Sequence, residues 1–308
     1  MRILLVDVDT KIPNLALHKL KKYHEDRGDV VTQIRDRKHT LPITIKTYDK
    51  IYVSCIFDYH KRQCQKWEGI AEIGGSGYSI TKKLPDEIEE IKPRINQGFT
   101  TRGCIRNCYF CVVPKKEGMI RAIGDVYDLW DGKSKQIIIM DNNILALPKH
   151  FMKVSEQIKK ENLIVDFNQG LDFRLLTDEI CIRLLSLKHR WGNMRFAYDD
   201  IAYTKSVLKA LKMLEKHGLK KWSTRWYVYV GTKDTVDTVV QRVNLLRECN
   251  QLAFVMRDRQ VCDKSYPLFK EFQELYAYSS APHIFVNTPY YPGVMKAKIS
   301  REIRKGFF

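Results

Sequence analysis

Three cysteines in one short segment carry the clearest chemical signal of this sequence. Cys104, Cys108 and Cys111 are separated by three and by two residues, within a glycine-punctuated stretch that follows an expected strand. Three thiolates can hold three irons of a cubane cluster and leave the fourth iron open for a substrate or cofactor. The spacing therefore predicts an iron–sulfur site in residues 98–111.

The residues around these cysteines resemble the signature of the radical S-adenosylmethionine superfamily. The resemblance covers the aromatic Phe110 just before the third cysteine and the run 102–118, which is closest to the branch of methylthiotransferases and cobalamin-domain radical enzymes. It implies that Cys104, Cys108 and Cys111 ligate a 4Fe-4S cluster whose open iron takes the amino and carboxylate groups of S-adenosylmethionine. An electron donor such as flavodoxin or ferredoxin would then allow reductive cleavage to methionine and a 5′-deoxyadenosyl radical.

The residues alone leave a second interpretation of the cysteine segment open. Three thiols can bind zinc when the fold supplies a fourth ligand, and the candidates are Cys64, His60 and His150. The protein would then be a non-catalytic, zinc-stapled nucleic-acid binder. Of the other thiols, Cys55 and Cys64 could meet across a turn, whereas Cys181 falls in an apolar helical pattern and is expected in the core.

An α/β fold has to position these groups. From residue 91 onward, apolar strands alternate with helical patterns, which predicts parallel βα units. The expected strands are Ile95–Thr100, Gln136–Met140, Leu163–Phe167, Met194–Tyr198, Trp226–Val230 and Ala253–Met256. Six units agree with the partial (β/α)6 TIM-like barrel that the resemblance implies, which we place at residues 91–265. Residues 266–308 are then a C-terminal extension with a basic tail between Lys296 and Lys305.

Residues 1–90 are expected to form a small Rossmann-like α/β domain. Its buried strands are predicted at Arg2–Val8, Val30–Ile34 and Ile51–Phe57. This half resembles a trimmed, degenerate cobalamin-binding domain, but the Asp-x-His-x-x-Gly motif that would ligate cobalt is missing, so we do not expect bound cobalamin. The run 74–77, Gly-Gly-Ser-Gly, would let a ligand approach closely or would simply end a strand in a turn.

Polar residues follow all six expected strands, and the carboxyl ends of parallel strands meet at one edge of such a fold. The resemblance assigns cofactor roles there. The methionine ammonium would be held at the position of a family Gly-Gly-Glu stretch, here Asp141, Asn142 and Asn143. The backbone around Phe110 would meet the adenine, and Asp199 or Asp200 would accept from the ribose hydroxyls. Arg257 is a further cofactor candidate, and the candidates for substrate contact are Gln169, Asp172 and Arg174.

Charge points to the class of substrate. The net charge is +17 and the sequence pI is near 9.4, which favours a polyanionic partner. We therefore expect a radical enzyme that modifies a nucleic acid or a nucleotide. A peptide or small-metabolite substrate remains the alternative, in which the basic surface is incidental. The residues do not indicate an oligomeric state.

The remaining sequence features bear on the location of the protein in the cell and on its reaction. No apolar run is long enough to span a bilayer, and Met1–Val8 is too short and too soon acidic for a signal peptide. We expect a cytoplasmic protein with reduced, metal-binding thiols. Methylthiotransferases carry three more cluster cysteines in an N-terminal domain and a C-terminal RNA-binding barrel. This sequence shows neither, so we expect a different reaction.

Overall fold

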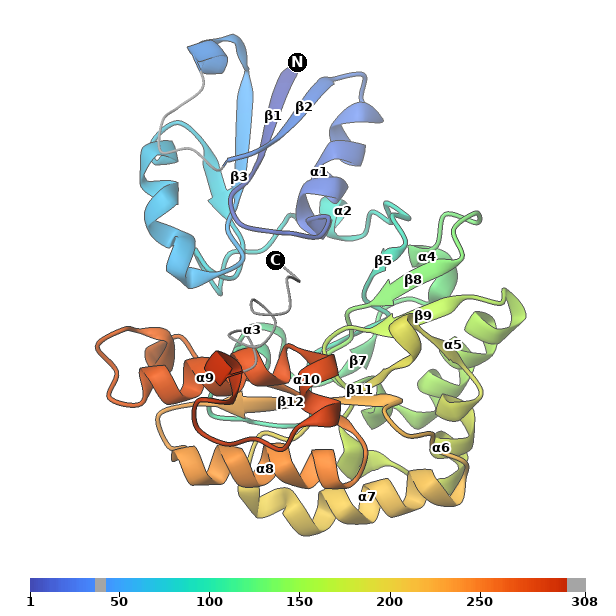
Figure 1. Ribbon diagram of the computed structural model, residues 1–308. Helices are drawn as coiled ribbons and strands as arrows, with labels where there is room; N and C mark the ends of the chain where they lie inside the picture. The colour runs from blue at the N-terminus through green and yellow to red at the C-terminus, as the bar shows by residue number, and fades with distance from the viewer. Residues whose placement is uncertain (37–42, 298–308) are drawn as a thin grey trace, which may run out of the picture. The chain divides into compact units, whose positions relative to one another are not determined.

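The computed structural model describes residues 1–36 and 43–297 (Figure 1). The chain divides into two compact units, of which the first is Met1–Ile137 and the second begins at Ile138. The predicted boundaries at residues 90 and 265 stay predictions. The predicted basic tail lies mostly outside the described residues. None of the helices in the described ranges is long and apolar enough to cross a membrane.

The first unit contains a parallel four-stranded sheet with the order β2-β1-β3-β4. Its strands are β1 (Arg2–Asp7), β2 (Val30–Arg35), β3 (Lys50–Ser54) and β4 (Glu72–Gly74). Helix α1 (Leu15–Glu25) connects β1 to β2, and the side chain of Asn14 caps its start by accepting from the Leu17 amide at 3.3 Å. This arrangement agrees with the predicted α/β class.

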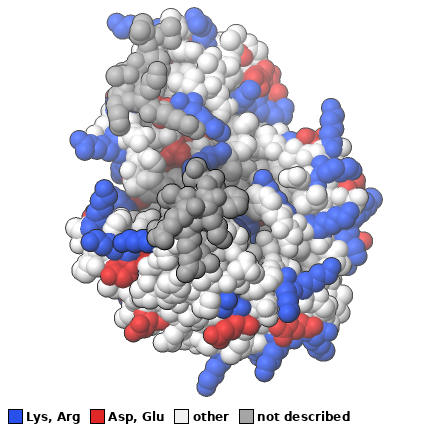
Figure 2. Space-filling model, in the orientation of Figure 1, with Lys and Arg blue, Asp and Glu red and all other residues white. Residues whose placement is uncertain are grey.

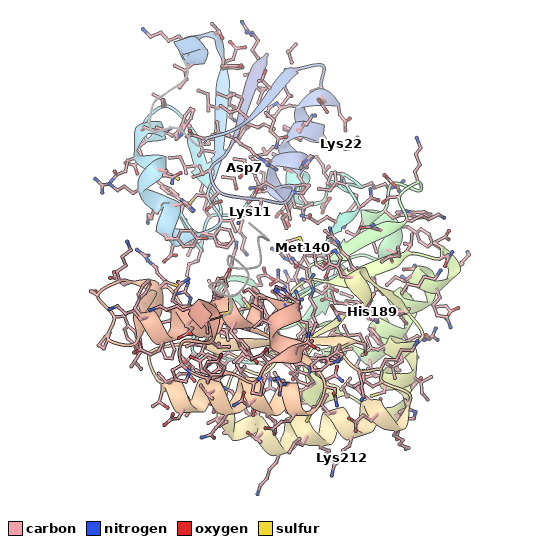
Figure 3. All side chains as sticks on the ribbon, viewed as in Figure 1. Asp7, Lys11, Lys22, Met140, His189 and Lys212 are labelled. Atoms are coloured by element: carbon pink, nitrogen blue, oxygen red, sulfur yellow. The ribbon has the colours of Figure 1, made fainter. Side chains whose placement is uncertain are left out.

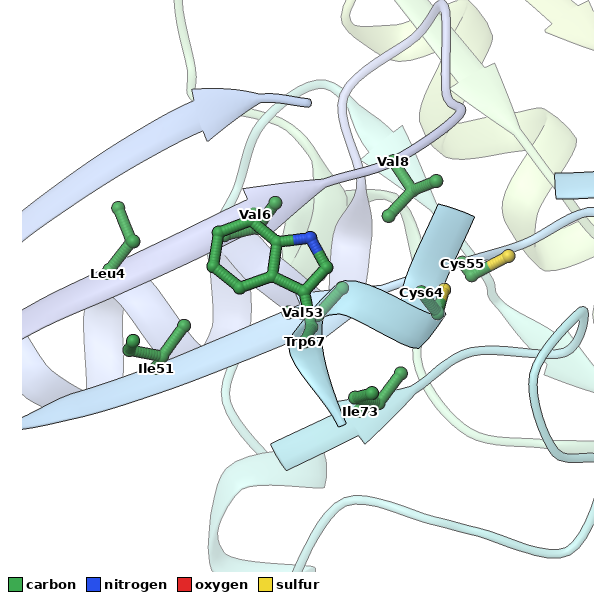
Figure 4. Close-up of a cluster of buried hydrophobic side chains, with 9 residues drawn as sticks. All are labelled: Leu4, Val6, Val8, Ile51, Val53, Cys55, Cys64, Trp67 and Ile73. Atoms are coloured by element: carbon green, nitrogen blue, oxygen red, sulfur yellow. The ribbon is translucent and has the colours of Figure 1, made fainter. Parts of the chain in front are cut away.

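One face of this sheet is covered by an apolar cluster centred on Trp67 (Figure 4). Trp67 ends a 3-10 helix, η2 (Asp58–Trp67), and is fully buried. Its indole Nε1 donates to Asp36 Oδ2 at 2.8 Å, which satisfies the one polar group of the ring. Cys55 and Cys64 lie in the same cluster with no exposed surface.

The segment that leads to the cysteines is less regular than predicted. In place of one strand at Ile95–Thr100, the chain forms β5 (Gln97–Gly98) and β6 (Thr101–Arg102). Arg94 and Asn96 have positive φ angles of 49° and 62°, which an extended strand cannot contain. The short elements around them are α2 (Asp86–Glu89), β7 (Arg121–Ala122) and α4 (Val126–Leu129).

The second unit is built from parallel strands and amphipathic helices. Strand β8 (Gln136–Ile139) begins at the unit boundary, and β9 (Ile164–Phe167) and β10 (Lys188–His189) are parallel neighbours. A second sheet has the order β11-β12-β13, with β11 (Met194–Ala197), β12 (Thr224–Val230) and β13 (Leu252–Arg257) all parallel. The predicted strands are therefore confirmed in this part of the chain.

Six helices accompany these strands: α5 (Pro148–Lys160), α6 (Asp178–Leu185), α7 (Thr204–Lys216), α8 (Val236–Glu248), α9 (Phe269–Ser279) and α10 (Pro282–Asn287). Thr177 caps α6 by accepting from the Ile180 amide, as its sequence position predicted. Alternate residues of β12 are buried, beginning with Thr224 and ending with Val230. The other face of β12 carries Arg225, Tyr227 and Tyr229, which are only half-buried.

The predicted α/β class is confirmed, since parallel strands alternate with helices. A TIM-like barrel is not confirmed, because no closed sheet is found among the described residues. A single parallel bridge between Leu171 and Phe196 links the segment after β9 to β11. The described 3-10 helices besides η2 are η1 (Ile43–Thr47), η3 (Ile144–Ala146), η4 (Phe173–Leu175), η5 (Arg190–Gly192), η6 (Ile201–Tyr203) and η7 (Gln260–Cys262).

Candidate functional site

The three predicted cluster cysteines lie in one loop whose ends are tied together. Strands β6 and β7 form an antiparallel pair in which Thr101 is opposite Ala122 and Arg102 is opposite Arg121. Everything between them, residues 103–120, therefore leaves and returns at the same point. We call this segment the cysteine loop. Its only helix is α3 (Val113–Glu117), which begins after the last cysteine and has Pro114 in its first turn.

The base of the cysteine loop is held by backbone contacts and one carboxylate. Glu117 accepts from the Gly103 amide at 3.0 Å and pairs with Arg102 at 3.2 Å, while the Cys104 amide donates to the Gly118 carbonyl at 3.1 Å. Gly103 has a φ of +87°, and a Cβ there would stand 2.4 Å from the Met119 carbonyl oxygen. Only glycine allows this close approach.

The thiols of the loop are partly accessible and form no disulfides. Cys104, Cys108 and Cys111 are each half-buried, and none forms a disulfide. The Arg106 amide donates to Cys104 Sγ at 3.3 Å, an interaction that also tunes iron-bound sulfurs. The number and type of donors fit a cluster with one open iron. No preformed arrangement of three or more His, Cys, Asp or Glu side chains for a metal ion is found in the described residues.

The zinc interpretation loses one of its proposed fourth ligands. Cys64 lies in the apolar cluster of the first sheet, and its partner there is Cys55. The interaction with Cys64 and then burial raise the pKa of the Cys55 thiol well above its usual value. These two cysteines do meet, as the sequence suggested, but inside a core.

Aromatic side chains lie beside the second and third thiols. Tyr109 is 60% exposed, and its ring meets that of Phe110 edge to face at a centroid distance of 5.3 Å. Phe110, whose backbone the resemblance places against adenine, is half-buried. Lys116 follows on α3, donates to Ser76 Oγ, and has its pKa lowered by burial. Lys116 was not among the predicted site residues.

The glycine run of the first unit is explained by its own chain. A Cβ on Gly75 would stand 2.2 Å from the Cys55 carbonyl oxygen, and a Cβ on Gly77 would stand 2.4 Å from the backbone of Phe57. Asp9 fixes the same segment by accepting from the Ile56 and Phe57 amides at 3.0 and 2.7 Å. The glycines therefore serve close packing of backbone on backbone.

In the second unit, the ends of β8 and β9 are joined by predicted site residues. Asn143 Nδ2 donates to Asp172 Oδ2 at 3.4 Å, and Arg174 Nε donates to Asp172 Oδ1 at 2.6 Å. The Arg174 guanidinium lies 4.9 Å from the centroid of the Tyr203 ring. A cofactor candidate and two substrate candidates are thus in direct contact. Asp141 is buried and Asn142 half-buried just before Asn143.

Asp199 and Asp200 follow β11 but differ in their surroundings. Burial raises the pKa of Asp199 to about 6, against the opposing attraction of Arg174 and Arg242. Asp200 is exposed and caps η6, accepting from the Ala202 amide at 2.9 Å. Of the two, only Asp199 has a pKa that is raised by burial, which makes it the stronger candidate for a functional carboxylate.

A fully buried arginine holds the strand ends behind Asp199. Arg242 of α8 has no exposed surface, and its Nη1 donates to the carbonyls of Tyr198 at 3.2 Å and Tyr229 at 2.9 Å. Its Nη2 pairs with Asp234. Arg242 therefore ties the carboxyl ends of β11 and β12 together. It was missed in the sequence, where it reads as one more charge on an amphipathic helix.

Two predicted residues stand apart from this network. Gln169 is exposed, and Arg257 lies over the rings of Tyr276 and Phe269 at 5.0 and 5.9 Å from their centroids. On the face shown in Figure 2, Lys and Arg occur in many places and alternate with Asp and Glu. Net charge alone therefore marks no binding surface on that face.

Comparison with known proteins gives one informative match. No family model matches the sequence. The chain is similar to the tRNA-2-methylthio-N(6)-dimethylallyladenosine synthase of Flavobacterium johnsoniae, with 28% identity over 181 residues. The match covers 45% of this chain and 37% of the synthase, so the chain spans well under half of that relative's length. A likeness to a methylthiotransferase suggests the radical S-adenosylmethionine superfamily and an enzyme of that kind.

Proposed function

We propose that this protein is a radical S-adenosylmethionine enzyme that acts on a nucleic acid or nucleotide. The observation that carries the proposal is the cysteine loop, in which three reduced thiols sit on a segment closed by β6 and β7. The match to a methylthiotransferase supports the superfamily, and that relative is named as a tRNA-modifying synthase.

In this proposal Cys104, Cys108 and Cys111 hold a 4Fe-4S cluster. The bound cluster and cofactor supply reductive cleavage of a carbon–sulfur bond and thus a 5′-deoxyadenosyl radical. The chain's own residues aim and shield this chemistry. Glu117 and Gly103 fix the base of the loop, as their contacts indicate.

Several residues of the second unit are further candidates for binding cofactor or substrate. Asp199, ionised above about pH 6, accepts hydrogen bonds from ribose hydroxyls, and Arg242 keeps the strand ends in place behind it. Asn143, Asp172 and Arg174 form one polar network for the methionine part of the cofactor or for the substrate. The strands from β8 to β13 would form the open (β/α)6 arrangement of the superfamily, for which the parallel bridge after β9 is support.

The test is anaerobic purification followed by metal and product analysis. Iron and sulfide near four per chain after reconstitution, and 5′-deoxyadenosine after addition of dithionite and S-adenosylmethionine, are the expected results. Zinc near one per chain with no iron, and no cleavage with any reductant, would contradict the proposal. Binding of tRNA that weakens steeply with salt would support the nucleic-acid substrate, because neutralised phosphates release counterions. Salt-insensitive binding would point to a peptide or small metabolite.

A further inference from the structure

Two arginines lie side by side on the half-buried face of the second unit's sheet. Strands β11 and β12 are parallel, and their register places Arg195 opposite Arg225. Like charges directly opposite each other in a sheet are destabilising unless something lies between them. Both arginines are the second residue of their strand, whereas Asp199 follows the carboxyl end of β11. The pair is therefore separate from the proposed cofactor network.

Arg195 is held in place by three hydrogen bonds to the protein, which involve Nη1 and Nη2 but not Nε. Its Nη2 donates to Asp166 Oδ2 at 2.9 Å, and its Nη1 donates to Asn168 Oδ1 at 3.1 Å and to the Tyr227 hydroxyl at 2.7 Å. Arg190 lies 3.7 Å from the same Asp166 carboxylate. Arg195 is thus a fixed cation, and one carboxylate serves two guanidinium groups.

Arg225 has no such partner. Its Nε is buried without a hydrogen bond, and no acceptor or carboxylate is found for its guanidinium among the described residues. Burial and then the charge of Arg195 lower its pKa, but a guanidinium keeps its proton in proteins. Arg190 and Arg195 share the Asp166 carboxylate, and Arg225 lies opposite Arg195 with no carboxylate of its own among the described residues. The three guanidinium groups therefore carry a formal excess of two positive charges over that carboxylate. A half-buried excess of this kind is costly unless an anion balances it.

An exposed aromatic ring adjoins the arginines. Trp191 is 68% exposed, and the guanidinium carbons of Arg190 and Arg195 lie 4.4 and 5.2 Å from the centroid of its ring. Its backbone has a φ of +55°, a conformation that bulky residues rarely adopt. An exposed ring beside cations suits stacking of a base whose phosphate is bound next to it.

We propose that Arg190, Arg195 and Arg225 bind a nucleotide phosphate and that Trp191 stacks on its base. A phosphate monoester carries close to two negative charges, which would balance the excess of two positive charges on the arginines. Two neighbouring guanidinium groups also match the geometry of its oxygens. This nucleotide site is separate from the residues that the proposed function uses. The one link rests on the proposed function: if it holds, the bound nucleotide would belong to the substrate.

The test is calorimetric titration of the 308-residue chain, purified without iron, with three probes: adenosine 5′-monophosphate, adenosine and inorganic phosphate. We expect the nucleotide to bind at least tenfold more tightly than either of the others. Arg225→Gln should weaken its binding at least tenfold. Lys212→Gln, which removes one exposed charge on α7 (Figure 3), should change it less than twofold. Trp191→Ala should weaken binding of the nucleotide and leave binding of inorganic phosphate unchanged.

Thermal unfolding without ligand gives an independent readout. Because Arg225 faces an unbalanced charge, Arg225→Gln should raise the unfolding midpoint of the ligand-free chain and abolish the rise that the nucleotide causes in the wild type. Equal binding of nucleotide and adenosine, or a Gln variant that binds like the wild type, would overturn the proposal. Equal binding of phosphate and nucleotide would overturn the role of Trp191. None of these readouts needs cofactor cleavage, so they succeed or fail separately from the proposed function.

Discussion

The first unit contains five cysteines in two regions that could hardly differ more. Cys55 and Cys64 are free thiols that lie 0% exposed in the apolar cluster under the first sheet, where they interact with each other. Cys104, Cys108 and Cys111 lie half-buried in a loop whose backbone is closed at its base. Spacing alone treats both sets as candidate ligands. Burial and the closure of the loop separate a packing role from a chemical one.

The largest effect is expected for Cys108→Ala. It removes one of three thiolates from a cluster that has no protein ligand on its fourth iron, so iron content and 5′-deoxyadenosine formation should fall to background together. Cys181→Ala, a buried thiol of α6, should keep both. Iron analysis and product chromatography of the two variants decide the matter. A Cys108 variant with full iron would move the site elsewhere.

Gly103→Ala should disturb the loop without touching a thiol. The added Cβ meets the Met119 carbonyl oxygen at 2.4 Å, and the φ of +87° costs about 1–3 kcal/mol more for alanine. We expect less than half of the wild-type iron content. Gly132→Ala is the matched control, because its φ of +80° is also positive, its Cβ would meet nothing within 4 Å, and it lies outside the cysteine loop. Equal iron in both variants would mean that the close contact is not needed.

Burial accompanies a packing role at Cys55 of the first unit. Asp199→Asn tests whether burial instead accompanies a functional role in the second unit. The pKa of Asp199 is raised from 3.8 to about 6 by burial. The native state thus keeps a proton that the unfolded chain has lost, so wild-type stability falls as pH rises from about 4 to about 6. The Asn variant should lack this slope and be about 1–2 kcal/mol more stable above pH 6.

Binding gives the functional half of the same experiment. Wild-type affinity for S-adenosylmethionine should rise as the pH passes through about 6, because the carboxylate is the better acceptor for ribose hydroxyls. The Asn variant should bind with an affinity that does not change over this range. A wild type without pH dependence between 5 and 7 would remove Asp199 from the cofactor site.

The smallest effect is expected for Cys64→Ala. Removing one sulfur from the Trp67 cluster should lower the free energy of unfolding by about 1 kcal/mol and leave iron content unchanged. Denaturant unfolding and iron analysis measure both quantities. Loss of iron in this variant would mean that both cysteine regions take part in metal binding and that Cys64 is a metal ligand.

Much of the fold could be predicted because hydrophobic periodicity is local. The strands that were predicted in the second unit lie within about two residues of their observed bounds, whereas the short β10 was not predicted, and Thr177 was recognised as a helix cap. The stretch before the cysteines was not, because positive φ angles at Arg94 and Asn96 leave no trace in an apolar pattern. Asp200 resembled a ligand by position, although its carboxylate also caps η6.

Site residues could be predicted only where they directly follow a strand in the sequence. Placing Asn143, Asp172 and Asp199 after strands followed from the chain alone, and Asn143 does contact Asp172. The pairing of Arg195 with Arg225 depends on the register between β11 and β12, which a sequence does not state. The role of Arg242 depends on which carbonyls its helix faces, and that is decided by tertiary packing.

Arg242 has a consequence for how this protein can diverge. The carboxyl ends of β11 and β12 are held from behind, by a side chain of α8 that bonds to the main-chain carbonyls of Tyr198 and Tyr229. Main-chain acceptors are present whatever the side chain, so residues 199–200 can change without loosening these bonds. We therefore expect homologues to differ at residues 199–200 and to keep an arginine at position 242. The support of the strand ends would be inherited, while the residues in front of it would change.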